Sequence, residues 1–294
     1  MKSSRTSTLV KGRCVALYVD VERENARTIA LRVADGFRKL GYAIALCPGC
    51  DAHLNIPTDG ARPSDAALLI TIGGDGTLLR AARIAVEDDT PLLGINTGRL
   101  GFLTEFDEDD PRIDQLPELL ERGLAIEERV ALRAEYGGRE FFALNDVVVR
   151  RGSTSRIVPF GLCLGQEQAA HIPADGICIA TPTGSTAYFL SAGGSIVSPD
   201  VDAFGIVPLL PHTLFSRPLI VPASSKITIS VDSEIVHANL ECDGEAVSDL
   251  APGASVVIER HPKAVRFART SPLKFFSRLE EKLRWGVSIK ETFR

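Results

Sequence analysis

A single carboxylate stands in a glycine-rich turn between two apolar stretches, in the sequence LLITIGGDGTLLRAA of residues 68–82. The three glycines of this turn permit positive φ angles and allow a ligand to approach the backbone. A helix that begins at Thr77 would direct free N–H groups toward an anion such as a phosphate. Because Asp75 would repel a phosphate, we expect its carboxylate to hold a hydroxyl group or a metal ion.

Two common phosphate-binding patterns do not fit this turn, whereas one structural alternative does. No Gly-Lys-Ser/Thr follows the glycines, as a Walker A loop requires, and Leu79 stands where G-x-G-x-x-G needs its last glycine. Asp75 could instead cap the N-terminus of the helix that follows. The turn alone therefore leaves a ligand site and a helix cap as alternatives.

A second candidate segment, ADGICIATPTGSTAYFLSAGGSIV at 174–197, places a carboxylate before a strand and a dense run of hydroxyls after it. Hydroxyls and backbone N–H groups at a strand-to-helix turn can bind ribose and phosphate, and a tyrosine offers a ring face. A polar surface turn is the alternative. The polar side chains of this segment are Asp175, Thr181, Thr183, Ser185, Thr186, Tyr188 and Ser191.

A third candidate is the tripeptide LND at 144–146. The side-chain amide of Asn145 offers a donor and an acceptor beside the carboxylate of Asp146. Together they could bind an adenine edge or a ribose, and an ordinary turn is the alternative.

The elements that position these residues change character near residue 125. The first part alternates strands with helices, and its strands are continuous apolar runs, which are typical of a parallel sheet buried on both faces. Apolar residues spaced as in a helix run from Ala26 to Leu40 and resume at Leu78. A further short helix is expected at 116–124, and the strands are expected at 13–19, 42–46, 66–72 and 91–96.

The second part has strand after strand from residue 130 to 260, separated by turn residues, which predicts an antiparallel, β-sandwich-like domain. A helical pattern returns at 272–286, and we expect this C-terminal helix to pack back on the first domain. The predicted fold is therefore α/β plus all-β. Its spans are an α/β domain at 1–125, a β-rich domain at 126–270 and the C-terminal helix at 271–294.

Composition excludes some classes of partner. The 294 residues carry a net charge of −5, so no basic field is present to bind nucleic acid or an anionic membrane. No apolar run approaches the ~18 residues of a spanning helix. The first residues also lack the apolar core of a secretory signal. We therefore expect a cytoplasmic protein without nucleic-acid or membrane partners.

Three further features have ordinary structural explanations. Cys47, Cys50 and His53 have the spacing C-x-x-C-x-x-H, which a redox pair or part of a zinc site could use, but Pro-Gly is also a usual turn after a strand. The other four cysteines are isolated in apolar surroundings and are expected to be buried thiols. The acidic run EFDEDD at 105–110 could bind a metal, although a solvated linker is more usual.

Taken together, these motifs resemble those of the NAD kinase family and stand in its order, over roughly residues 13–286. GGDGT alone is less specific, since lipid kinases and phosphofructokinases carry similar turns, whereas TPTGSTAY is highly specific. The matching stretches are GGDGT at 73–77, NTGRLGFLTE at 96–105, LND at 144–146, DGICIATPTGSTAYFLSAGG at 175–194, PHTLFSRPLIVP at 211–222 and RLEEKLRWG at 278–286.

The resemblance implies phosphorylation of NAD at the 2′-hydroxyl of its adenosine ribose, giving NADP, with ATP or inorganic polyphosphate as donor. It also implies a divalent metal, expected to be Mg²⁺ that enters with the donor phosphates, and a homodimer or homotetramer. Asp75 would be the proton acceptor. The residues expected to bind NAD or the donor are Gly74, Gly76, Arg80, Asn145, Asp146, Arg156, Asp175, Thr183, Thr186, Ala187, Tyr188, Ser191 and Glu245.

This chain departs from the family pattern at two positions. Asp146 stands where Glu is common, and Glu245 follows the glycine of CDGE where the family often has Gln. Two other functions are weighed against a NAD kinase. A lipid kinase of the diacylglycerol type would need an apolar acceptor pocket, against which the hydroxyls at 181–191 argue. An inactive NAD-binding sensor is the other alternative, against which the intact Asp75 argues.

Overall fold

The computed structural model describes residues 12–50, 54, 56–98, 101–153, 157–214, 216–271 and 275–286. The chain divides into two compact units. Unit 1 comprises 1–81, 90–127 and 266–294, and unit 2 comprises 82–89 and 128–265. Among the described helices, none is long and apolar enough to cross a membrane.

Unit 1 is built on one sheet with the strand order β2-β1-β3-β4-β19-β6, and the short strand β5 also pairs with β4. The pairs of β1 with β2 and β3, and of β4 with β3, β5 and β19, are parallel. The predicted α/β part with a parallel sheet is therefore confirmed. The strands are β1 (Cys14–Val19), β2 (Ala43–Leu46), β3 (Leu68–Gly73), β4 (Leu92–Asn96), β5 (Phe106–Asp107), β6 (Ala125–Arg129) and β19 (Val265–Arg269).

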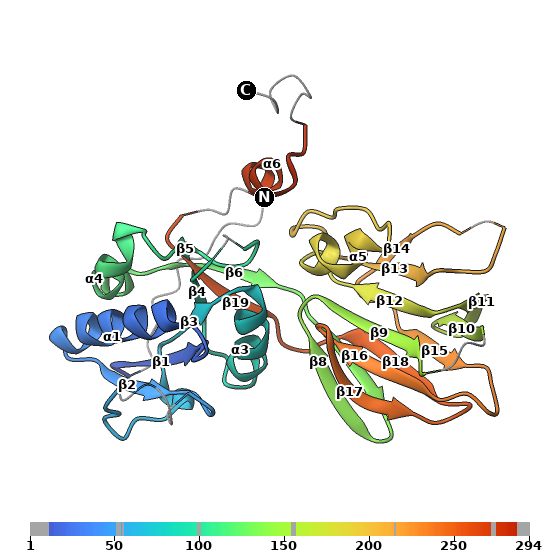
Figure 1. Ribbon diagram of the computed structural model, residues 1–294, viewed down its shortest axis with the longest axis horizontal. Helices are drawn as coiled ribbons and strands as arrows, with labels where there is room; N and C mark the ends of the chain where they lie inside the picture. The colour runs from blue at the N-terminus through green and yellow to red at the C-terminus, as the bar shows by residue number, and fades with distance from the viewer. Residues whose placement is uncertain are drawn as a thin grey trace. The chain divides into compact units, whose positions relative to one another are not determined.

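Helix α1 (Glu24–Lys39) buries the apolar face that the sequence pattern predicts, and it contacts β1, β2, β3 and the short helix α4 (Leu116–Arg122). Figure 1 shows α1 beside these strands, with α4 next to it. Its buried side chains are Ala26, Ile29, Ala30, Val33, Ala34 and Phe37. The helix ends before Gly41, whose φ of 80° suits the reversal into β2.

The strand order reverses between β1 and β3, because β2 lies on one side of this pair and β4 on the other. In open parallel sheets, ligands bind beyond the carboxyl ends of the strands at such a reversal. The glycine turn lies at this point, since β3 ends at Gly73 and helix α3 (Asp75–Glu87) begins two residues later. We predicted a helix start at Thr77, so Asp75 is already in the first helical turn.

Unit 2 contains two six-stranded sheets, with the orders β11-β10-β15-β18-β7-β8 and β14-β13-β12-β9-β16-β17. The strand pairs of both sheets are antiparallel in the part of the chain that the structure describes. A core of buried Val, Ile, Leu and Phe side chains joins strands of both sheets, as expected of a sandwich. The strands are β7 (Leu132–Tyr136), β8 (Arg139–Ala143), β9 (Asp146–Arg151), β10 (Val158–Leu164), β11 (Glu167–Ala174), β12 (Gly176–Ala180), β13 (Ala203–Leu209), β14 (Leu219–Pro222), β15 (Ile227–Val231), β16 (Ala238–Cys242), β17 (Glu245–Leu250) and β18 (Ser255–Arg260).

Strand β19 differs from the predicted organisation. We placed residues 126–270 in the β-rich domain, but β19 pairs in parallel with β4, through Phe267 and Leu92, in the sheet of unit 1 (Figure 1). Helix α6 (Phe275–Leu283) follows in the same unit, as expected of the C-terminal helix. Nothing in the local sequence of β19 indicates which distant strand it joins.

Candidate active site

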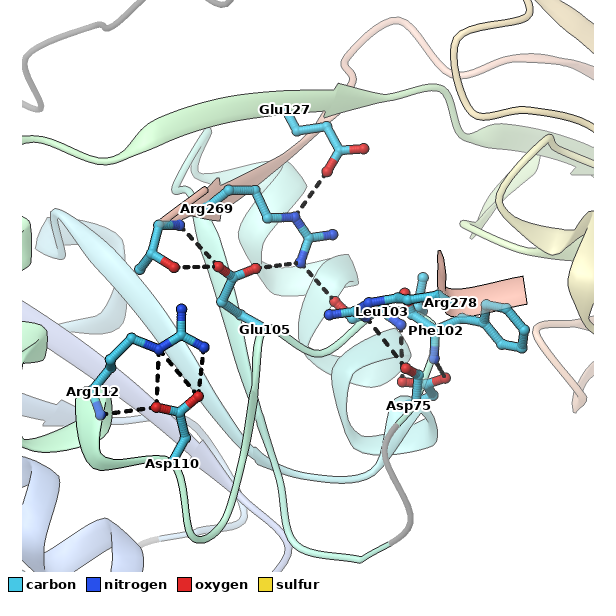
Figure 2. A network of polar contacts seen from close by, with 11 residues as sticks. Asp75, Phe102, Leu103, Glu105, Asp110, Arg112, Glu127, Arg269 and Arg278 are labelled. Carbon is cyan, nitrogen blue, oxygen red and sulfur yellow. Dashed lines mark hydrogen bonds and ion pairs between the residues drawn. The ribbon is translucent and has the colours of Figure 1, made fainter. Parts of the chain in front are cut away.

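The carboxylate of Asp75 is directed at the backbone of another segment and does not cap its own helix. Its Oδ2 accepts a hydrogen bond from the N–H of Phe102 at 2.8 Å, and its Oδ1 accepts one from the N–H of Leu103 at 3.2 Å (Figure 2). An ionised carboxylate offers about four lone-pair sites. Asp75 is therefore oriented by two donors and retains acceptor capacity for a ligand hydroxyl.

Gly101 allows this close approach. A Cβ atom at Gly101 would lie 1.9 Å from Oδ1 of Asp75, so a larger residue would displace the carboxylate. The motif NTGRLGFLTE contributed to the sequence resemblance without a role for any single residue. The structure supplies a role for its second glycine.

The glycines of the turn act differently from our expectation. None of Gly73, Gly74 and Gly76 has a φ in the left-handed region. A Cβ at Gly73 would meet Thr77, whereas a Cβ at Gly74 or Gly76 would have nothing within 4 Å. The turn therefore needs glycine for close packing at Gly73, and leaves open space over Gly74 and Gly76. Arg80 is exposed on α3.

In unit 2, a carboxylate that sequence reasoning missed holds the LND tripeptide. Asp243 accepts hydrogen bonds from the N–H groups of Leu144 (2.9 Å), Asn145 (2.7 Å) and Asp146 (3.2 Å). Asp243 and Gly244 both have positive φ and form the turn between β16 and β17. The Asp-Gly pair in CDGE signals this hairpin turn, but no local pattern reveals that its carboxylate binds three consecutive amides.

The backbone of Asn145 is fixed from the other side by the hydroxyl-rich segment. The N–H of Thr181 donates to the carbonyl of Asn145 at 2.9 Å, and a Cβ at Gly184 would lie 2.0 Å from the same oxygen. The side-chain Oδ1 of Asn145 is buried and has no hydrogen-bond partner. Because a buried acceptor without a donor costs free energy, this atom is well suited to accept a hydrogen bond from a ligand.

Asp146 is only 4% exposed, and its carboxyl group is poorly placed for ionisation. Burial raises the pKa of Asp146 to about 7, with further contributions from the negative charges of Asp243 and Glu241. Burial also raises the pKa of Asp243, against the effect of its three N–H donors. Two acids with raised pKa values therefore lie next to Asn145.

A pocket of about 570 Å³ lies at the N-terminal end of β12, whereas Asn145 lies near its C-terminal end. Asp175, Tyr188 and Ser191, all predicted site residues, line it together with Arg150 and Arg151. Two arginine contacts organise these side chains. Nε of Arg151 donates to Oδ1 of Asp175 at 2.6 Å, and Nη2 of Arg150 donates to the Tyr188 hydroxyl at 2.7 Å. The hydrogen bond from Arg151 lowers the pKa of Asp175.

Sequence reasoning missed both arginines, although DVVVRR ends a strand with two adjacent cations. The short helix α5 (Tyr188–Ser191) is anchored by Phe189, which is fully buried. A Cβ at Gly194 or Gly205 would come within 2.4 Å of its ring. These two glycines therefore make room for the side chain that holds Tyr188 and Ser191 at the pocket.

The predicted residues of unit 2 form two groups. In the β9–β12 pair, Asp146 lies opposite Ala180, and Arg150 lies opposite Gly176. The group around Asn145 and the group around Asp175 thus lie at opposite ends of β12, roughly 15 Å apart at ~3.4 Å per residue.

The remaining predicted residues of unit 2 make separate contacts. Thr183 accepts a hydrogen bond from Arg129, and Thr186 donates to the Thr183 carbonyl. Ala187 immediately precedes α5. Glu245 is exposed and forms an ion pair with Arg83 at 3.0 Å. Arg156 lies outside the described residues.

Comparisons with known proteins identify the family of this chain. Residues 14–125 match the family described as the ATP-NAD kinase N-terminal domain, and residues 144–270 match the ATP-NAD kinase C-terminal domain. A NAD kinase of Heliobacterium modesticaldum is 36% identical over 280 residues, which cover 92% of this chain and 99% of that protein. The chain belongs to the NAD kinase family. A NAD kinase of Aquifex aeolicus is 40% identical over 233 residues, covering 76% of this chain and 84% of that protein.

Solved structures of the NAD kinase family have the same fold. A yeast NADH kinase complexed with NADH superimposes with a TM-score of 0.82 at 26% identity, covering 95% of this chain and 89% of that one. An NAD kinase from Archaeoglobus fulgidus in complex with ATP gives a TM-score of 0.72 at 24% identity, covering 92% and 98%. The second likeness bears on the fold alone.

Patterns outside the NAD kinase motifs have structural roles. Cys47 and Cys50 are buried, and Sγ of Cys50 accepts a hydrogen bond from the N–H of Val19 at 3.3 Å. His53 lies outside the described residues. In the acidic run, Asp110 accepts hydrogen bonds from Arg112. Within the described residues, no group of three or more His, Cys, Asp or Glu side chains could hold a metal ion.

The raised pKa of Asp146 predicts how stability depends on pH. Between about pH 4 and pH 7, the folded protein keeps a proton on Asp146 that the unfolded chain has released. The free energy of unfolding therefore falls as the pH rises through this window. Asp146→Asn removes this contribution. We therefore expect the free energy of unfolding of the variant, relative to that of wild type, to be higher at pH 8 than at pH 5, by up to a few kcal/mol.

Urea unfolding at the two pH values measures this difference. Asp175→Asn is the matched control. Because the pKa of Asp175 is lowered, removal of this carboxylate should not raise the stability relative to wild type between pH 5 and pH 8. An Asp146→Asn variant whose stability difference from wild type is the same at both pH values would contradict the prediction.

Proposed function

We propose that this NAD kinase family member transfers a phosphoryl group from ATP or inorganic polyphosphate to the 2′-hydroxyl of the adenosine ribose of NAD, giving NADP. The observation that supports this most is the state of Asp75. Two backbone amides orient its carboxylate at the carboxyl edge of a parallel sheet, and acceptor capacity remains for a hydroxyl. Phosphoryl transfer depends mainly on positioning and charge stabilisation, which suits such a site.

In this mechanism, Asp75 orients the 2′-hydroxyl in line with the transferring phosphorus and accepts its proton as the O–P bond forms. The carboxylate does not need to remove the proton early, because the transition state is loose and the hydroxyl becomes acidic only as the bond forms. The open space over Gly74 and Gly76 leaves room for a substrate beside the carboxylate. Arg80 and Arg156 are proposed as further ligand contacts.

We assign the adenosine part of NAD to Asn145 and Asp146. The unpartnered Oδ1 of Asn145 can accept a hydrogen bond from an amino group or a hydroxyl, and the neighbouring carboxyl group of Asp146 adds a second polar contact. The pocket lined by Asp175, Tyr188 and Ser191 is proposed to bind the rest of the dinucleotide, and its volume is within the usual range for small-molecule sites. Thr183, Thr186, Ala187 and Glu245 stay predicted contacts.

A divalent metal is proposed to arrive with the donor, as the magnesium complex of ATP or polyphosphate. The described residues do not form a resident metal site. Mg²⁺ is commonly held by substrate phosphates and few protein ligands. We therefore treat the metal as part of the donor substrate, and the steps assigned to Asp75 do not pass through it.

A homodimer or homotetramer is proposed for the assembly. Leu219 and Ile220 are 42% and 44% exposed on β14, which is an edge strand of its sheet. Exposed apolar edge strands favour association with another chain. The cytoplasmic location expected from the sequence stays a prediction.

Sedimentation analysis tests the proposed assembly. Between micromolar and nanomolar protein, we expect a particle of two or four chains, and we expect Ile220→Lys to shift it toward smaller species by burying a charge at the contact. Val201, 45% exposed and outside every strand, provides the control variant Val201→Lys, which should sediment as wild type. A single-chain particle at all concentrations contradicts the proposal.

The role of Asp75 predicts a specific loss of turnover. Asp75→Asn keeps the shape of the side chain but removes its charge and basicity, so kcat for NADP formation should fall by ~10²–10⁴-fold, the usual contribution of a general base. NAD binding, measured separately by calorimetry, should persist. An Asn variant with near-wild-type turnover would rule out this role.

The assignment of Asn145 predicts which substrate loses affinity. Asn145→Ala removes the buried acceptor, and loss of one such hydrogen bond costs about 1–3 kcal/mol. The KM for NAD at saturating ATP should therefore rise by roughly tenfold or more, while the KM for ATP changes little. Ser153→Ala is an exposed control in the same unit. A raised KM for ATP with an unchanged KM for NAD would reverse the assignment.

A further inference from the structure

We propose that Arg278 of α6 and Arg269 of β19 are positioning residues for Asp75, acting through the backbone of residues 101–103. This inference rests on the proposed role of Asp75 as proton acceptor. We call residues 101–103 the relay segment. Figure 2 shows Phe102 and Leu103 between the guanidinium group of Arg269 and the carboxylate of Asp75.

The relay segment makes polar contacts on both sides. Nη1 of Arg278 donates to the carbonyl of Gly101 at 3.3 Å and to the carbonyl of Phe102 at 2.9 Å. The N–H groups of Phe102 and Leu103 donate to the two oxygens of Asp75. Because a carbonyl and the following N–H belong to one peptide group, two successive peptide groups each link Arg278 to one oxygen of Asp75.

A planar peptide group transmits this contact electrically as well as mechanically. The C=O and N–H of a trans peptide point in opposite directions and share one delocalised system. A cation at the carbonyl oxygen therefore strengthens the hydrogen bond that the N–H donates, as in other chains of hydrogen bonds. Arg278 thus supports both hydrogen bonds that orient the Asp75 carboxylate.

Arg269 holds the end of the relay segment. Its Nη1 donates to the carbonyl of Leu103 at 3.0 Å and contacts Oε2 of Glu105 at 3.3 Å, and its Nε donates to Oε2 of Glu127 at 2.8 Å. The residue is 2% exposed. Glu105 also accepts hydrogen bonds from the N–H and hydroxyl of Thr270. This guanidinium is therefore rigidly held, and it fixes the carbonyl next to the peptide groups that reach Asp75.

The two arginines are placed at an electrostatic cost. Burial lowers the pKa of Arg278, and the positive charge of Arg269 lowers it further, while Glu105 and Asp75 act in the opposite direction. One fully buried cation and one partly buried cation are a poor device for stability alone. Their carbonyl partners all lie in the one segment that orients Asp75.

Positioning of this kind matters because the relay segment begins with glycine, whose backbone would otherwise sample many conformations. A less flexible residue cannot replace Gly101, because its Cβ would clash with Asp75. The relay segment therefore depends on contacts with other residues to keep one conformation. Displacement of a reacting group by ~1 Å can lower a rate by ~10²-fold. We therefore expect loss of Arg278 to affect turnover more than substrate binding.

The test compares Arg278→Met, Arg278→Lys and the control Arg112→Met. Arg278→Met keeps an apolar stem and removes the donors, so kcat should fall roughly ten- to hundredfold while the KM for NAD changes less than about threefold. Arg278→Lys keeps a charged donor and should recover most of the loss. Arg112 pairs with Asp110 in the same unit, away from the relay segment, and its variant should retain wild-type kcat.

A double variant separates positioning of Asp75 from other effects on the fold. In the Asp75→Asn background, Arg278→Met should lower kcat less than about twofold further, because residues that act as a unit are not additive. A full additional loss would overturn the proposal, as would wild-type kcat in Arg278→Met. If Arg278→Met does not fold, Arg278→Gln, which keeps a neutral donor, takes its place in the same cycle.

The outcomes distinguish this inference from the proposed function. Near-wild-type turnover of Asp75→Asn would remove the role of Asp75 itself. A slow Asp75→Asn enzyme together with a fast Arg278→Met enzyme would leave that role intact and would overturn only the positioning by Arg278.

Discussion

The buried charge of Arg269 imposes the constraint on which unit 1 depends. A cation removed from water is tolerated only where carboxylates and carbonyls replace its hydration. Arg269 meets this requirement at Nε and Nη1, with Glu105, Glu127 and the carbonyl of Leu103, while its Nη2 is buried without a hydrogen-bond partner. These partners come from β6, from the approach to β5 and from the segment that contacts Asp75. One buried guanidinium on β19 therefore joins residues 103–105 to Glu127 of β6, and both lie far from it in sequence.

Unit 2 uses the reverse arrangement, with a carboxylate as the central group and amides around it. Asp243 accepts three consecutive N–H groups at 144–146, so the peptide that carries Asn145 has little freedom. Thr181 holds the same peptide through its carbonyl. In unit 1, backbone groups held by charged residues orient the Asp75 side chain, whereas in unit 2 a charged residue holds the backbone that carries Asn145.

The parts that the sequence predicted are those with local signals. Strands β1, β3 and β4 are unbroken apolar runs, and α1 has a clear helical period, so the parallel sheet could be inferred. GGDGT and TPTGSTAY indicated the family. Between residues 130 and 260 the sequence predicted strands in general. It did not indicate the bounds of β11, whose half-exposed residues EQAAHIPA have little pattern, or of β13, whose apolar run is interrupted by Gly205 and Pro208.

The missing residues of the site depend on contacts between distant segments. Asp243 lies about a hundred residues from the amides it binds, and Arg269 and Arg278 lie far from Gly101 in sequence. No window of neighbouring residues contains both partners of such a contact. The positions of these side chains became clear only once the strand order of each unit was known.

The return of β19 to the first sheet has a consequence for synthesis. Residues 130–264 separate β6 from β19, and these residues form most of unit 2. At ~5–20 residues per second, the ribosome needs roughly ten seconds or more to make this span. During that time, Leu92 of β4 lacks its partner Phe267, and Glu105 and Glu127 lack their cation. Strand β5 already pairs with the other end of β4, but the first sheet can be completed only after the residues of unit 2 have been made.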